Sequence, residues 1–117
     1  MMKCIPLILT LLLTSTSALS FASVVYCSGK IENSYVELNG NVIIKGKWRN
    51  DWTKLCNTKE DDSISCSLWA SYAATAVKDN LDVTVQYVIE DGSTCETLPT
   101  YSDSPAPNYL MIYNPAL

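Results

Sequence analysis

Four cysteines are the residues of this chain best suited to covalent chemistry, namely Cys27, Cys56, Cys66 and Cys95. The segment ahead of them begins with Lys3, continues with an apolar run and ends in small residues, which is typical of an exported protein. Thiols in an oxidising compartment pair, so we expect two disulfides. The separation of ten between Cys56 and Cys66 lacks the close pairing of a zinc knuckle, and no metal is expected.

The four cysteines allow three connectivities, of which we predict Cys56–Cys66 together with Cys27–Cys95. Cys56 ends an expected strand and Cys66 begins an expected helix, so a bridge between them would close the acidic loop that joins the two elements. The second bridge would tie the first strand to the turn region of the last hairpin.

Histidine is absent from the chain, which excludes serine or cysteine catalysis with a histidine base and a histidine-ligated zinc site. Paired carboxylates could hydrolyse glycosidic bonds, and the local candidates are residues 60–62 and the pair Glu90 and Asp91. The first group precedes a helix and the second lies in a hairpin turn, so structural roles are favoured. A calcium site in the acidic loop lacks the spaced ligands and glycine of an EF-hand. We therefore expect neither an enzyme nor a cofactor.

Aromatic residues are the remaining candidates for function, because tyrosine and tryptophan combine apolar area with a polar group and are frequent at binding surfaces. Trp52, Tyr101 and Tyr109 flank turns or a proline-rich loop, and we predict that they contact a ligand. Other aromatic residues fall on expected core faces and are predicted to be structural: Trp48, Trp69, Tyr72 and Tyr87.

Residues 1–22 are predicted to be a signal peptide with cleavage after Ala22, because the apolar run is interrupted well before the roughly 20 residues that span a bilayer. Cleavage would leave one domain, residues 23–117, secreted or periplasmic and with no stable membrane insertion. Removing Lys3 leaves seven basic against twelve acidic residues, a net charge of −5, which disfavours nucleic acid as a partner. A core this small needs its disulfides.

The first half of the mature chain predicts three strands. Val24 to Leu38 forms the first, with a bend at Ser28-Gly29, and the Asn39-Gly40 pair suits a tight hairpin turn. Val42 to Trp48 alternates with period two, and Trp52 to Cys56 forms a short third strand.

The second half predicts one helix and two or three further strands. Apolar residues recur at helical spacing between Cys66 and Val77, and the predicted buried stripe is Leu68, Trp69, Tyr72, Ala73, Ala76 and Val77. Residues 61–65 suit the start of the helix and residues 78–80 its end. Apolar and polar residues alternate over residues 81–89, which predicts a half-buried strand. The prolines of residues 98–107 exclude a central strand there, and residues 109–113 form the last strand. The fold class is a β-rich α+β domain, a small disulfide-bonded antiparallel sheet or OB-like barrel with one amphipathic helix.

One stretch of the chain resembles the binding subunits of pertussis-like bacterial toxins. These are small secreted domains with an oligonucleotide- and oligosaccharide-binding (OB) barrel. The stretch is the helix–strand junction from Cys66-Ser67-Leu68-Trp69 to Val83-Thr84-Val85-Gln86-Tyr87, with the preceding Leu55-Cys56 to Cys66 step. The resemblance covers most of the mature chain in element order but few residues, and it assigns no sugar-contacting positions. It implies a homo-oligomeric ring of subunits that pack through their helices, and a glycan-binding surface.

Three functions fit these features. The favoured one is a secreted binding module that recognises a glycan or a cell-surface receptor as a subunit of an oligomer. The first alternative is an exported inhibitor whose partner is a secreted enzyme, and the second is a small carboxylate-dependent hydrolase.

Overall fold

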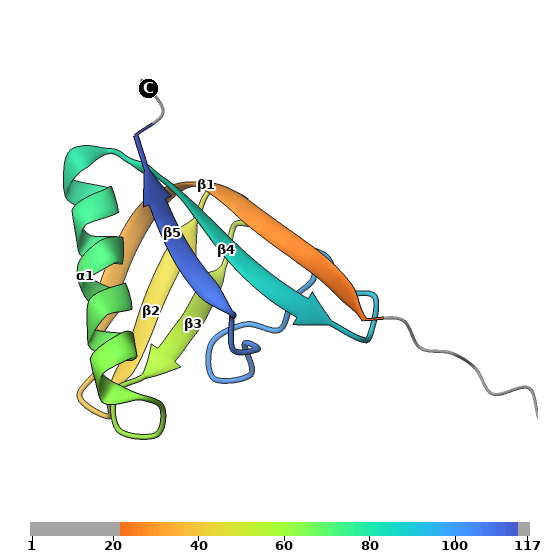
Figure 1. The fold of residues 1–117 in the computed structure, drawn as a ribbon, viewed down its shortest axis with the longest axis horizontal. Coiled ribbons are helices and arrows are strands. Elements are labelled where there is room, and N and C mark those ends of the chain that lie inside the picture. Colours follow the sequence, from red (N-terminus) through yellow and green to blue (C-terminus); the bar gives the residue numbers. More distant parts are fainter. Residues whose placement is uncertain (1–21, 115–117) are drawn as a thin grey trace, which may run out of the picture.

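A five-stranded antiparallel sheet and one helix make up residues 22–114, the part of the chain that the computed structural model describes. The elements are β1 (Ser23–Val36), β2 (Asn41–Gly46), β3 (Trp52–Asn57), α1 (Ser63–Asp79), β4 (Asp82–Ile89) and β5 (Tyr109–Tyr113). The strands lie in the order β3-β2-β1-β4-β5, and α1 runs along one side of the sheet (Figure 1). The predicted β-rich α+β class is confirmed. The predicted signal peptide lies outside the described residues apart from Ala22.

The long strand β1 belongs to both halves of the sheet. Its residues 23–30 pair with β4 and its residues 31–36 pair with β2. Gly29, within the stretch that pairs with β4, has a φ of 146°, which favours glycine, and the register shifts by one residue between Ile31 and Asn33. The predicted irregularity of β1 is present, but its register shift lies at residues 31–33 rather than at Ser28-Gly29. Strand β1 thus connects a β2–β3 half and a β4–β5 half of the sheet.

The core lies between the inner face of the sheet and α1. Alternate residues of β4 point inwards, as the sequence predicts, because a strand turns successive side chains to opposite faces. The buried apolar side chains that form this core include Val42, Ile44, Leu55, Val83, Val85, Tyr87, Ile89 and Leu110. Burying each of the larger ones contributes about 1.5–3 kcal/mol, so the core is the main source of stability.

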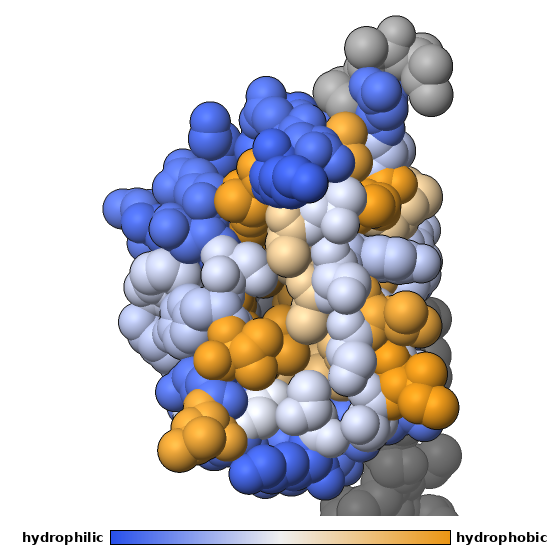
Figure 2. Space-filling view, turned by 90° about the vertical axis from the view of Figure 1, so that its left-hand side faces the viewer, coloured by the Kyte–Doolittle hydropathy of each residue, from blue (hydrophilic) through white to orange (hydrophobic). Residues whose placement is uncertain are grey.

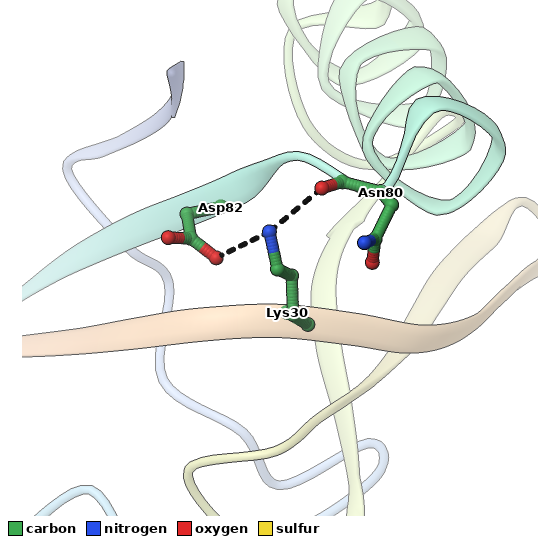
Figure 3. A network of polar contacts seen from close by, with 3 residues as sticks. All are labelled: Lys30, Asn80 and Asp82. Carbon is green, nitrogen blue, oxygen red and sulfur yellow. Dashed lines mark hydrogen bonds and ion pairs between the residues drawn. The ribbon is translucent and has the colours of Figure 1, made fainter. Parts of the chain in front are cut away.

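Helix α1 is capped at both ends by residues that the sequence pattern indicates. The Asp62 carboxylate accepts a hydrogen bond from the backbone N–H of Ser65 at 2.8 Å, and this bond lowers the pKa of Asp62. Asn80 ends the helix in the left-handed conformation with a φ of 53°. The Lys30 ammonium donates to the Asn80 carbonyl at 2.7 Å and pairs with Asp82 at 2.9 Å (Figure 3), which joins the helix end to β1 and β4. No described helix is long and apolar enough to cross a bilayer.

The buried stripe of α1 is narrower than predicted. The prediction was wrong for Leu68, Tyr72 and Val77, which are 51%, 41% and 38% exposed. The helix contacts the sheet through small residues such as Ala73 and Ala76, and Trp69 is half-buried against the core. Small contact residues let the helix lie close to the sheet on a thin strip, and the larger residues beside that strip remain in solvent. Figure 2 shows this side of the molecule, where hydrophobic residues form separate groups divided by more polar ones.

Both predicted disulfides are confirmed. Cys56 at the end of β3 is bonded to Cys66 in the first turns of α1, with 5.7 Å between their Cα atoms. Cys27 of β1 is bonded to Cys95 of the loop between β4 and β5, with 5.5 Å between Cα atoms. One bridge therefore fixes the helix to the β2–β3 half, and the other fixes the β4–β5 loop to the centre of the sheet.

Two local features differ from the predictions. The β1–β2 loop spans residues 37–40, and only Gly40 has a positive φ, at 97°, although Asn39 could also have taken one. Strand β2 ends at Gly46 rather than at Trp48. The Trp48 ring packs on Gly46, where a Cβ atom would lie 2.4 Å from the ring, and it contacts the core as predicted. Glycine at position 46 thus provides the space that Trp48 occupies.

Candidate ligand-binding site

Aromatic and basic side chains gather on the outer face of the β2–β3 half. Tyr35 of β1 is the register partner of Ile43, and Lys45 is the partner of Trp52. The rings of Tyr35 and Trp52 meet edge to face, with centroids 5.3 Å apart and planes at 72°. Tyr101 joins them from the loop between β4 and β5. These five residues form what we call the Trp52 site.

Ile43 forms the floor of the Trp52 site. It is 1% exposed, yet it lies outside the core cluster that contains its neighbours Val42 and Ile44. Successive strand residues face opposite sides of a sheet, so Ile43 points outwards and is covered by side chains of that face. Its register partners there are Tyr35 and Lys54, whose side chains are its direct cross-strand neighbours. The site therefore has an apolar base beneath its rings.

Tyr101 is held against β3 in a strained conformation. Its φ is 50°, in the left-handed region that tyrosine rarely adopts. Its backbone N–H donates to the Trp52 carbonyl at 3.2 Å, and it forms an isolated parallel bridge with Thr53. Such strain costs about 1–3 kcal/mol and persists only where surrounding contacts impose it, which is frequent at binding sites.

Arg49 supplies the contacts that hold this loop. Its side chain is 6% exposed, and its guanidinium donates to the carbonyls of Leu98 and Pro99 in the loop and of Trp52 in β3. Burial lowers the pKa of Arg49, and the charge of Asp51 opposes that shift. Arg49 is therefore a positioning residue for Tyr101. The sequence analysis did not predict this role of Arg49. That Arg49 is the only arginine of the chain could have indicated it, because a guanidinium can donate to several carbonyls at once.

Two ammonium groups lie at the site. The Lys45 nitrogen is 5.8 Å from the centre of the Trp52 ring, within the range of a cation–π contact. The Lys54 ammonium donates to the Ser102 carbonyl at 3.2 Å, and the Lys54 backbone N–H donates to the Ser104 hydroxyl. Desolvation, followed by the nearby Glu37 and Tyr101, raises the pKa of Tyr35. Tyr35 therefore stays a neutral hydrogen-bonding group at physiological pH.

The structure brings two of the three predicted ligand-contacting residues together. Trp52 and Tyr101 are adjacent, whereas Tyr109 lies on β5 opposite Gln86 of β4, in the other half of the sheet. Tyr35 completes the site and was not predicted, because its neighbour Ile43 comes from another strand.

Three of the acidic residues considered for catalysis, Asp61, Asp62 and Asp91, have structural partners. The Asp61 carboxylate accepts a hydrogen bond from the Asn57 N–H at 2.7 Å, and Asp91 accepts one from Ser93 at 2.9 Å. Within residues 22–114, no three histidine, cysteine, aspartate or glutamate residues are grouped to hold a metal ion.

No protein-family model, curated protein or solved structure matches the chain. The site's chemistry must therefore be argued from its own residues.

Proposed function

We propose that this protein is a secreted binding module that recognises a glycan through the Trp52 site. The observation that carries the proposal is the convergence of Trp52 and Tyr101 with Tyr35 over the buried Ile43. Rigid aromatic rings present flat apolar area at a small cost in conformational entropy, and their polar atoms bond to hydroxyl groups. The ammonium groups of Lys45 and Lys54 add donors for sugar oxygens at the same face.

The place of the site in the fold supports the same function. The element order, with the helix between β3 and β4, and the strand order β3-β2-β1-β4-β5 fit a partly open OB-type barrel. Barrels of this kind bind oligosaccharides and oligonucleotides on the face of strands 2 and 3 with the β4–β5 loop, where the Trp52 site lies. The acidic balance of the chain favours the sugar over the nucleic acid. Membership of the pertussis-like toxin subunits stays a prediction.

Two tyrosines make a matched test. Tyr101 lies in the Trp52 site and is 45% exposed, whereas Tyr109 lies outside it and is 37% exposed. We expect Trp52→Ala and Tyr101→Ala each to weaken retention of the secreted protein on a glycan array by about 5–10-fold, since one aromatic contact is worth about 1 kcal/mol. Measured below about 1 µM, so that contacts between copies do not contribute to retention, Tyr109→Ala should leave retention unchanged.

A loss of retention in Tyr109→Ala, with none in Trp52→Ala or Tyr101→Ala, would place the glycan elsewhere and refute the site. If the parent protein is retained by no glycan or cell surface and instead inhibits a secreted hydrolase, the inhibitor function replaces the proposal. Far-ultraviolet spectra of the variants should match that of the parent in either case.

A further inference from the structure

A second exposed surface lies on the outer face of the β4–β5 half. The strand register places Val24 beside Val88, and it places Tyr26 and Tyr109 on either side of Gln86. We call this surface the outer-sheet patch, and its large apolar members are Val24, Tyr26, Val88, Tyr109, Met111 and Tyr113. Their exposed fractions range from 37% for Tyr109 to 57% for Tyr26.

The patch is a consequence of strand alternation. The residues between its members, such as Cys27, Val85 and Leu110, pack into the core. Outward positions of an antiparallel sheet in contact with water are normally polar, which gives the alternation hydrophobic-in and polar-out. Here large apolar side chains are exposed on three neighbouring strands, and they surround the polar Ser28, Thr84 and Gln86. Exposed apolar side chains grouped in this number indicate an interaction surface.

Several polar groups within the patch already have partners. The Gln86 amide donates to the Tyr26 hydroxyl at 3.2 Å, and the Asn108 amide donates to the Gln86 oxygen at 3.1 Å. The hydroxyl groups of Ser28 and Thr84 are 2.8 Å apart. Covering these groups would leave their hydrogen bonds in place, so the desolvation cost is small.

Charged residues flank the patch at both ends: Lys30 and Asp82 form their ion pair at one end, and Glu90 and Glu96 lie near Val88 and Val24 at the other. No other Lys, Arg, Asp or Glu lies on the outward positions 24–28 of β1, 84–88 of β4 or 109–113 of β5. The excess of acidic residues makes two copies of this protein repel each other over most orientations. The uncharged stretch between the two ends of the patch is where they can approach.

The area of the patch is sufficient for a dimer. Its three tyrosines expose on the order of 250 Å², and all six side chains on the order of 500 Å², which is the upper part of the range for a monomer's largest patch. Two copies meeting through this face would bury roughly 1,000 Å², the lower limit for a specific protein pair.

We propose that the outer-sheet patch binds a second copy of this chain, with the two β4–β5 halves packed face to face about a two-fold axis. Such a contact is self-complementary, since each copy uses the same residues, and closes at two subunits. Pairing of strand edges would leave both apolar faces in water, whereas face-to-face packing covers both. The surface is distinct from the Trp52 site, and the dimer does not depend on glycan binding.

The test is the solution mass of the secreted protein, measured by sedimentation equilibrium between about 1 and 200 µM, the range for a weak dimer. We expect the parent to move from monomer to dimer over this range. Val88→Lys should raise the dissociation constant at least about 100-fold, because it places like charges opposite each other across the two-fold axis. Leu68→Lys on α1 is the matched control, since Leu68 is 51% and Val88 49% exposed, and it should dimerise like the parent.

Met111→Lys repeats the test on β5 in case Val88→Lys does not fold, and the melting temperature identifies folded variants. A parent that stays monomeric over the whole range overturns the proposal. So does a folded Val88→Lys or Met111→Lys protein that dimerises as tightly as the parent. An oligomer that only Leu68→Lys dissociates would place the interface on the helix and equally overturn it.

Discussion

The two halves of the sheet expose aromatic residues in different ways. In the β2–β3 half, Tyr35 and Trp52 stand over an apolar floor beside ammonium groups, and a loop from the other half adds Tyr101. In the β4–β5 half, the outward aromatic residues are neighbours of valine and methionine, and the Gln86 amide bonds to the Tyr26 hydroxyl. Both surfaces are rich in tyrosine, so composition alone does not distinguish them.

The proposed division, with a glycan at the Trp52 site and a second copy of the chain at the outer-sheet patch, therefore rests on the ammonium groups and the loop of the first surface rather than on aromatic content. A sugar needs donors and acceptors that are available to it and a loop that shapes the site. A second protein surface instead needs apolar area without unsatisfied groups. The following predictions test whether the two halves are also held together by different means.

The largest effect is expected from the disulfides, because each serves a different part of the fold. Replacing Cys27 and Cys95 with serine should lower the free energy of unfolding by about 4 kcal/mol, and replacing Cys56 and Cys66 by about 3 kcal/mol, since the longer loop gains more from closure. Urea unfolding measures both. The reverse order would mean that the bridge between β3 and α1 is the principal constraint.

Next in size is the loss of Arg49. Arg49→Ala should cost about 3 kcal/mol, because it leaves the carbonyls of Leu98 and Pro99 without their donor. The matched control is Lys54→Ala, which removes a solvent-exposed bond to a carbonyl of the same loop and should cost less than about 0.5 kcal/mol. Equal melting temperatures for the two variants would contradict the anchoring role of Arg49.

A smaller effect concerns alkaline pH and the inner face of the β4–β5 half. Burial raises the pKa of Tyr87 to about 12, and its hydroxyl has no hydrogen-bond partner among the described residues. The folded-state pKa lies above the unfolded value near 10, so the stabilisation is complete below about pH 10 and is lost as the pH rises towards 12.

We expect a loss of about 2–3 kcal/mol across that pH interval in the parent, measured by urea unfolding at each pH. Tyr87→Phe should remove this loss, whereas Tyr109→Phe at an exposed position should retain it. A parent whose stability is flat to pH 12 would show that the Tyr87 hydroxyl is hydrated in the folded state.

Much of the fold could be predicted because its signals are local. The Asp62 cap and the alternation of residues 82–89 depend on neighbours along the chain, and the prolines of residues 98–107 exclude a strand wherever they lie. The disulfide pairing could be predicted from the order of these elements, because it places Cys56 and Cys66 at the two ends of one short loop. Periodicity did not show which strip of α1 would meet the sheet, since the apolar residues Leu68 and Tyr72 fit a stripe as well as the alanines do.

The candidate site was harder to predict because its contacts are distant in sequence. Trp52 and Tyr101 were selected as residues flanking loops, but their adjacency depends on Arg49, which binds carbonyls of Leu98 and Pro99. Similarly, only the register of β1 with β2 places Tyr35 over Ile43. Sequence patterns contain no direct signal for such long-range contacts.

The loop between β4 and β5 is fastened at separate points, with exposed turns between them. The Cys95 disulfide fixes its first part, Arg49 its middle, and the Ser104 hydroxyl its later part on β3. Ser102 and Asp103 lie between fixed points and are exposed. Natural variation or a designed library could therefore change or lengthen this tip while the frame stays folded, so that one scaffold could acquire new specificities through a single replaceable loop.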